Sequence, residues 1–186
     1  MEDVIEYNGY KINIIQDVDS YNPRVDDNLG KITYNPSGSY ILGDTPMDGE
    51  DVDKIENNTR EYISIRVFAY IHSGTTIKAS DSNPFHCSWD SGQSGIIFIS
   101  KEKARKELGY IRLTKSKVEK IRNYLVSEVE TFNNYITGEV YGYDIEDSEG
   151  EEIDSCYGFY GDDHRKSGLL ETAEGLIDSL LDKEIF

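Results

Sequence analysis

Residues 138–161 read GEVYGYDIEDSEGEEIDSCYGFYG, and this stretch can be placed in register as a β-hairpin. A three-residue loop, Ser148-Glu149-Gly150 with Gly150 in the left-handed conformation, would join its two strands. One face would then be aromatic and apolar, with the pairs Ile145–Ile153, Tyr143–Ser155 and Tyr141–Tyr157. On the other face, the pairs would be Glu146–Glu152 and Asp144–Asp154, with side chains about 5 Å apart across the ladder.

Like charges that face each other destabilise a hairpin, so the acidic face needs an explanation. A bound cation would neutralise it, and a basic protein partner would do the same. Alternatively, repulsion between carboxylates exposed to water and salt is small enough to be tolerated. The sequence leaves these three explanations open.

Helices flank this hairpin. Ser116 and Glu119 have the spacing of a capping box, and apolar residues then recur every three or four positions until Gly138, which predicts one long helix. A second long helix is predicted from about Ser167. Its apolar side would comprise Leu169, Leu170, Ala173, Leu176, Ile177 and Leu180. A short helix is predicted over residues 101–108, capped by Ser100 and closed by Gly109.

The preceding sequence is typical of strands. Short β-branched or aromatic runs cover residues 4–7, 10–15, 31–34 and 40–42, and residues 44–59 are predicted to form an acidic loop or short helical turn. Core strands are predicted over residues 62–72, 75–79 and 95–99, the first two joined by Ser73-Gly74. We therefore predict a single α+β domain over residues 1–186, with an antiparallel sheet, two long amphipathic helices and one short helix.

The charge is uneven along the chain. The net charge of -17 divides into -8 for residues 1–60, +3 for residues 61–137 and -12 for residues 138–186. Such a protein is repelled by nucleic acid and by anionic membranes, and it is attracted to basic clefts of other proteins. Residues 101–122 hold nine Lys and Arg against three Glu. Solvated helix faces are the commoner explanation of that basic stretch, although it could also contact phosphates or the acidic end of a second copy.

Neither a signal-peptide pattern nor an apolar run of about 20 residues is present. We therefore expect a soluble protein that is not exported. Cys87 and Cys156 are too few for a disulfide framework and are expected to be free thiols. His86, Cys87, Cys156 and His164 could in principle converge on a metal ion, but the usual ligand spacings are missing, so no metal or cofactor is predicted.

The segment His86–Gly95, HCSWDSGQSG, has two interpretations. In the first, Cys87 is a nucleophile, His86 or His164 is the base and Asp90 orients that base. In the second, the segment is a bend that leads into a buried strand, with Trp89 in the core. Neighbouring residues of an extended segment point to opposite sides, so His86 and Cys87 do not readily form a dyad. We favour the bend and predict no enzymatic activity.

Three stretches carry a resemblance to a known family: WDSGQSGIIFISKEK (89–103), GEVYGYDI (138–145) and DSCYGFYGD (154–162). They resemble a family of uncharacterised acidic proteins found in phages and conjugative elements of low-GC Gram-positive bacteria. The likeness runs from residue 62 onward. It implies a phage or mobile-element protein in the bacterial cytoplasm, where small acidic proteins often act as inhibitors of restriction or CRISPR systems.

The resulting hypothesis is an acidic protein that binds and inhibits a host defence protein with a basic nucleic-acid-binding cleft, with nucleic-acid mimicry as one mechanism. The predicted partner contacts are Asp144, Glu146, Asp147, Glu149, Glu151, Glu152, Asp154, Asp162 and Asp163. Two alternatives stay open. One is a small-ligand-binding protein or enzyme that uses the His86–Asp90 loop. The other is an accessory phage protein that assembles with itself, for example as a homodimer.

Overall fold

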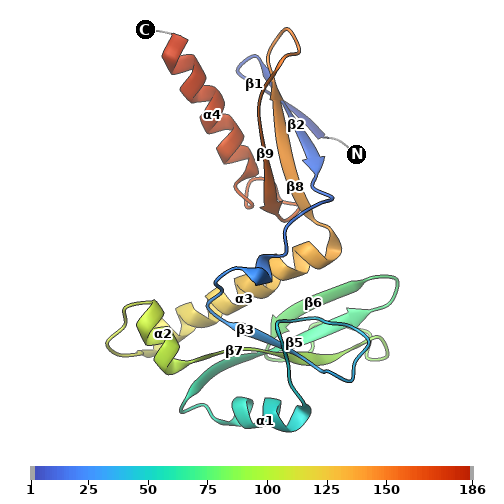
Figure 1. Cartoon of the computed structure of the whole chain (residues 1–186), viewed down its shortest axis with the longest axis vertical. Coiled ribbons are helices and arrows are strands. Elements are labelled where there is room, and N and C mark those ends of the chain that lie inside the picture. The colour runs from blue at the N-terminus through green and yellow to red at the C-terminus, as the bar shows by residue number, and fades with distance from the viewer. Residues whose placement is uncertain (1–2, 185–186) are drawn as a thin grey trace. The chain divides into compact units, whose positions relative to one another are not determined.

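The computed structural model describes residues 3–184 and has the predicted α+β fold with antiparallel sheets (Figure 1). Its strands are β1 Asp3–Tyr7, β2 Tyr10–Gln16, β3 Lys31–Tyr34, β4 Thr45–Pro46, β5 Tyr62–Ile71, β6 Thr75–Ser80, β7 Ser91–Ser100, β8 Val140–Glu146 and β9 Glu152–Tyr160. Its helices are α1 Gly49–Asn57, α2 Lys101–Glu107, α3 Lys115–Thr137 and α4 Leu169–Glu184, with a 3-10 turn at Pro23–Val25.

The contacts within the chain divide it into two compact units. The terminal unit comprises Met1–Asn22 together with Asn134–Phe186, and the central unit is Pro23–Asn133. Each unit contains its own sheet, whereas the sequence predicted one. Whether the whole chain folds as a single cooperative domain over residues 1–186 stays a prediction.

In the terminal unit, a four-stranded antiparallel sheet of order β1-β2-β8-β9 packs against α4 on one face (Figure 1). The hydrophobic cluster between them consists of Ile12, Ile14, Tyr143, Ile145, Leu169, Leu170, Ala173 and Ile177. Each fully buried large apolar side chain contributes about 1.5–3 kcal/mol to folding. The predicted apolar side of α4 is thus confirmed at its buried positions.

The register of the β8–β9 hairpin differs from the prediction. Gly150 has φ +86°, as expected for the loop, and Glu146 pairs with Glu152 as predicted. A bulge then shifts the ladder, so that Ile145 pairs with Asp154 rather than with Ile153. Beyond it, Asp144 pairs with Ser155 and Tyr143 with Cys156, and a second irregularity follows at Gly142.

In the central unit, the sheet has the order β4-β3-β7-β5-β6, antiparallel except for the short parallel pair β3–β4. α3 lies along one face and α1 on the other (Figure 1). The buried face of α3 consists of Ile121, Leu125, Val129 and Phe132. β3 and β7 approach closely at Gly95, where any Cβ atom would collide with the carbonyl oxygen of Thr33.

The predicted capping residues are confirmed at α2 and wrong at α3. Ser100 Oγ accepts from the Lys103 amide (3.1 Å) at the start of α2, and Gly109 has φ +65° just beyond its end. At α3, the predicted capping box is wrong: the helix begins at Lys115, and the hydroxyl that accepts an amide (Lys117, 3.4 Å) is that of Thr114. Residues 40–42 are not a strand, and the acidic segment 44–59 contains β4 and α1.

Candidate partner-binding surface

The face of the terminal sheet opposite α4, which we call the open face, carries the hairpin carboxylates of Asp144, Glu146 and Glu152. Alternation along strands sends the side chains next to Ile12 and Ile145 away from the core. Two rows cross all four strands on this face: Glu6, Lys11, Glu146 and Glu152 in one, and Val4, Asn13, Asp144 and Ser155 in the other. Among the described residues of this unit, no helix packs on it (Figure 1).

The carboxylates of the open face are weakly compensated. Lys11 lies in register between Glu6 and Glu146, and Glu146 directly faces Glu152. Within residues 3–184, none of the ion pairs includes a carboxylate from residues 144–154. A cross-strand pair of like charges costs a few tenths of a kcal/mol or more, so the fold retains this arrangement at some expense to stability.

Asp144 is held in place by a tyrosine. The Tyr157 hydroxyl donates to Asp144 Oδ1 over 2.8 Å. That hydrogen bond, together with partial burial and the negative charge of Asp144, raises the pKa of Tyr157 above its ordinary value. The Tyr157 ring lies over Gly142, where a Cβ atom would collide with it. The bulged segment therefore fixes the position of the Asp144 carboxylate.

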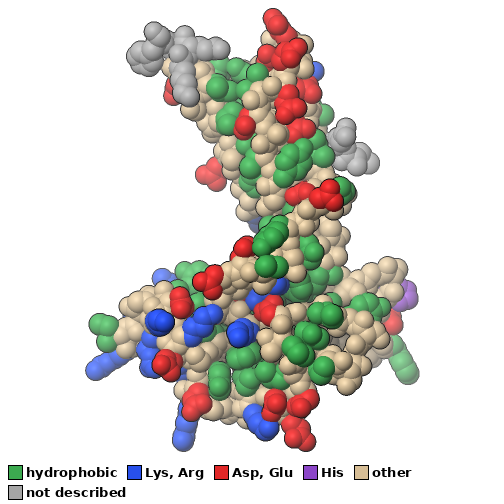
Figure 2. Space-filling view, viewed as in Figure 1, with side chains coloured by type: hydrophobic (Ala, Val, Ile, Leu, Met, Phe, Trp, Pro, Cys, Tyr) green, Lys and Arg blue, Asp and Glu red, His purple; other side chains and the backbone are tan. Residues whose placement is uncertain are grey.

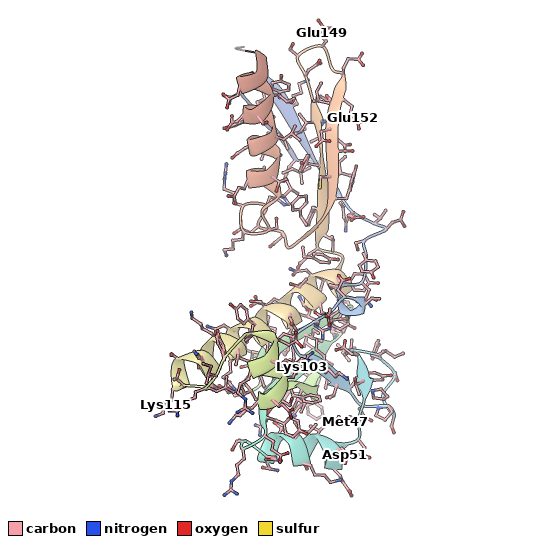
Figure 3. The ribbon with its side chains drawn as sticks, turned by 60° about the vertical axis from the view of Figure 1, so that its left-hand side comes forward. Met47, Asp51, Lys103, Lys115, Glu149 and Glu152 are labelled. Atoms are coloured by element: carbon pink, nitrogen blue, oxygen red, sulfur yellow. The ribbon has the colours of Figure 1, made fainter. Side chains whose placement is uncertain are left out.

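The hairpin loop fixes its own geometry through Asp147. Asp147 Oδ1 accepts from the amides of Glu149 (2.8 Å) and Glu151 (3.0 Å). Asp147 therefore stabilises the turn, and its carboxylate is partly used for this purpose. Glu149, Glu151 and Glu152 are exposed at the tip of the hairpin, where Figure 3 labels two of them.

Three predicted contacts lie elsewhere. Asp154 was predicted to face Asp144 but instead pairs with Ile145, so the bulge places it on the α4 side of the sheet, where it is half-buried. Asp163 Oδ1 accepts from the amide of Lys166 (3.2 Å), which lowers the pKa of Asp163, and its carboxylate also pairs with the Lys166 ammonium. Asp162 is exposed in the turn before α4.

Apolar side chains accompany the carboxylates. Ile153 is 42% exposed and Tyr157 is 47% exposed, although the sequence predicted both on the apolar face of the hairpin. Val4 is also exposed, in the second row of the open face. Because exposed apolar residues beside charged ones are typical of protein interfaces, the surface combines charge with apolar contact area.

Charge separates sharply between the two units. The terminal unit holds 20 Asp and Glu against 4 Lys and Arg, net -16, whereas the central unit holds 16 against 15, net -1. Figure 2 shows acidic side chains spread over the terminal unit and basic ones gathered around α2 and the start of α3. Nearly all of the chain's net charge therefore resides on one unit.

The His86–Asp90 loop does not form the predicted core. Trp89 is 95% exposed, so the prediction that it is buried is wrong. Cys87 Sγ donates to Asp90 Oδ2 (3.5 Å), and His72 Nδ1 lies 3.3 Å from the same oxygen. The carboxylate thus lies between the thiol and the imidazole, whereas nucleophilic catalysis needs the base beside the nucleophile. The sequence did not indicate His72, because β5 brings it to this loop.

The four residues considered as metal ligands do not belong to one unit. His86 and Cys87 lie in the central unit, and Cys156 and His164 in the terminal unit. Within the part of the chain that the structure describes, no group of three or more His, Cys, Asp or Glu residues is arranged to hold a metal ion. Both cysteines are free thiols. His164 packs edge-on against Tyr141, with ring centroids 4.8 Å apart.

An ionic network around the buried side chain of Arg24, in the central unit, was not predicted. Arg24, only 5% exposed, pairs with Asp44 (2.6 Å) and with Glu128 (3.1 Å). Burial opposes the charged form of Arg24, but the two carboxylates outweigh burial and raise its pKa. Glu128 also accepts from the Leu29 amide (2.7 Å) and lines a pocket of about 420 Å³. The network attaches residues 24–30 to α3 and is a structural feature of the unit.

Comparison with known proteins found no similar one: no family model, no curated protein and no solved structure matches this chain. Among the described helices, none combines the length and apolar character that crossing a bilayer requires. The functional argument therefore rests on the open face and on the charge distribution.

Proposed function

We propose that this chain is a phage- or mobile-element-encoded inhibitor that binds a host nucleic-acid-directed defence protein of the restriction or CRISPR type. The contact would be made by the open face and the hairpin tip of the terminal unit, and the chain would act without catalysis in the bacterial cytoplasm. The observation that carries the proposal is a set of carboxylates without an ion-pair partner among the described residues: the exposed Glu149, Glu151 and Glu152 and the half-buried Asp144 and Glu146.

Electrostatics supports a basic nucleic-acid-binding cleft as the target. Duplex DNA carries one negative charge per about 1.7 Å of axis, and proteins grip it through grooves rich in Lys and Arg. Such a groove attracts carboxylates displayed at high density by the same long-range field. The net charge of -16 on the terminal unit would accelerate its encounter with a basic cleft and oppose its encounter with nucleic acid.

Preorganisation supports tight binding. The Tyr157 hydroxyl fixes Asp144, and Asp147 fixes the loop that presents Glu149 and Glu151. Carboxylates held in place before binding lose less conformational entropy when the complex forms. Tyr157 and Ile153 add exposed apolar area beside the charges, which would help such a surface to discriminate between basic proteins.

A binding role for the His86–Asp90 loop is the second candidate. The almost complete exposure of Trp89 favours it, because exposed aromatic side chains are enriched at binding interfaces. In that case Trp89→Ala would abolish the biological effect, while charge changes on the hairpin would leave it intact.

The test measures the efficiency of plating of a phage on bacteria that carry a restriction or CRISPR system and express this chain. Expression of the wild-type chain should raise the efficiency of plating above that on bacteria without it. The variant Glu149→Gln/Glu151→Gln/Glu152→Gln should lose most of this protection, because it removes three exposed charges from the hairpin tip. The matched control Glu50→Gln/Asp53→Asn/Glu130→Gln removes three exposed charges from the central unit and should protect like wild type. Equal protection by both variants would contradict the proposal.

A further inference from the structure

The basic residues of the central unit form a second charged surface, separate from the open face. Four of the nine Lys and Arg in residues 101–122 already have contacts within the fold: Lys101 with the Thr59 carbonyl, Lys103 with the carbonyls of residues 28 and 29, Lys117 over the Tyr110 ring, and Arg122 with Asp81. The other five are exposed and have no ion pair with any described residue: Arg105, Lys106, Arg112, Lys115 and Lys120. We call these five residues the basic surface.

The basic surface extends from α2 across the connecting loop to the first turns of α3. Lys115, labelled in Figure 3, is the first residue of α3. Within the loop, Ile111 is 93% exposed and is followed directly by Arg112. A side chain as apolar as isoleucine gains free energy when a partner covers it. The surface therefore offers charge and an apolar contact together.

We infer that the basic surface binds the acidic hairpin of a second copy of this chain. The hairpin tip supplies exposed Glu149, Glu151 and Glu152, and exposed Ile153 lies beside them. Each surface thus combines several charges of one sign with one exposed isoleucine. Because the two surfaces are different patches, the contact is heterologous, with the hairpin of one copy on the basic surface of the next.

Local charge complementarity favours this occupant, because the hairpin tip presents three exposed carboxylates and the basic surface presents five exposed cations. Two copies of net charge -17 repel each other at long range, so the contact depends on this short-range match. A second copy presents its carboxylates in a compact hairpin, at a concentration equal to that of the basic surface. The attraction between the exposed charges of the two surfaces acts over about a Debye length, which is about 10 Å at 0.1 M salt, and it weakens as the salt concentration rises.

The inference does not rest on the proposed function, and its test needs no host protein. Sedimentation equilibrium in about 0.1 M salt should show association that increases with protein concentration and weakens markedly in about 1 M salt. The variant Arg105→Glu/Lys106→Glu/Arg112→Glu should raise the dissociation constant at least about tenfold, because like charges would then face each other. The control Lys31→Glu/Lys54→Glu/Lys78→Glu makes the same change of charge at exposed positions elsewhere in the central unit and should associate like wild type.

Mixing two defective variants gives the sharpest result. Glu149→Lys/Glu151→Lys/Glu152→Lys destroys the hairpin side but keeps the basic surface, and the Arg105→Glu/Lys106→Glu/Arg112→Glu variant does the reverse. Each should be monomeric alone, and an equimolar mixture should form a 1:1 dimer through the one intact pair of surfaces. Monomeric wild type at every concentration, or a mixture that stays monomeric, would overturn the inference. Salt-sensitive binding of short duplex DNA to a monomeric wild type, lost in the basic-surface variant, would assign the surface to nucleic acid instead. Circular dichroism verifies that each variant is folded.

Discussion

The two units of this chain use charge in opposite ways. In the central unit, five carboxylates pair with Lys or Arg, and the best buried of these pairs form the Arg24 network. In the terminal unit, only Asp163 and Glu174 do so among the described residues, although this unit has more carboxylates. Its stability comes from the hydrophobic cluster beneath α4. Charge that contributes little to folding remains available for a partner.

The largest expected loss of stability is that of a substitution in the central unit. Arg24→Ala removes the shared cationic partner of two carboxylates, Asp44 and Glu128, and leaves both partly buried with only backbone amides as donors. We expect a loss of about 3–5 kcal/mol in the free energy of unfolding, measured by urea denaturation. Arg165→Ala breaks the exposed pair with Glu174 in the terminal unit and should cost at most about 1 kcal/mol. Similar costs for both substitutions would contradict the contrast between the units.

The next effect separates the two isoleucines of the hairpin. Ile145 is fully buried and Ile153 is exposed. Ile145→Ala should therefore cost about 2–5 kcal/mol, because it leaves a cavity beneath α4. Ile153→Ala should cost no more than about 0.5 kcal/mol, as is usual for exposed positions. Chemical denaturation of the two variants checks the register directly. Equal losses of stability would mean that both isoleucines are buried, as in the predicted pairing of Ile145 with Ile153.

A smaller effect has the opposite sign in the two units. Glu152→Gln removes the repulsion with Glu146 and should raise the free energy of unfolding by a few tenths of a kcal/mol. Glu50→Gln removes an acidic side chain from the first turn of α1, where it favours the helix dipole, and should lower stability by about 0.3–1 kcal/mol. Thermal melts at low salt measure both changes, and added salt should reduce them. A stability loss for Glu152→Gln would mean that its carboxylate is compensated in the fold.

The smallest effect concerns Tyr157. Its pKa is raised chiefly by the hydrogen bond to Asp144, so the folded state favours the protonated phenol. This stabilisation is complete below the ordinary tyrosine pKa of about 10 and is lost as the pH rises through the higher folded value. Ultraviolet titration, taken as the difference between wild type and Tyr157→Phe, isolates this group. Asp144→Asn should bring its pKa back towards the ordinary value, and an unchanged pKa would show that Asp144 does not fix the ring.

Local sequence rules predicted the elements that depend on neighbouring residues. Ser100 and Gly109 bound α2, the apolar spacing gave α3 and α4, and Gly150 gave the hairpin loop, because each is determined within a few residues. Thr114 rather than Ser116 caps α3, since two hydroxyls two residues apart offer nearly equivalent caps. The acidity of the hairpin followed from composition alone.

Long-range packing determined what the sequence did not predict. β8 pairs with β2, which lies over 120 residues away in the sequence, and the bulge at Ile153 decides which β9 residues share the α4 side with the buried β8 residues. Asp154 therefore reached the α4 side of the sheet. The same pairing joins both ends of the chain into one unit and so produces two sheets. The contact of His72 with Asp90 and the exposure of Trp89 likewise arise from tertiary structure.

Capture of the target from the bacterial host tests the central claim most directly. Immobilised wild-type chain should retain a DNA-binding protein at about 0.1 M salt, release it towards about 1 M salt, and lose it to added duplex DNA, because DNA and the hairpin would compete for one basic cleft. The Glu149→Gln/Glu151→Gln/Glu152→Gln chain should retain little of it, and the Glu50→Gln/Asp53→Asn/Glu130→Gln chain should retain it fully. Retention of the same protein by the hairpin variant, unaffected by duplex DNA, would contradict the account.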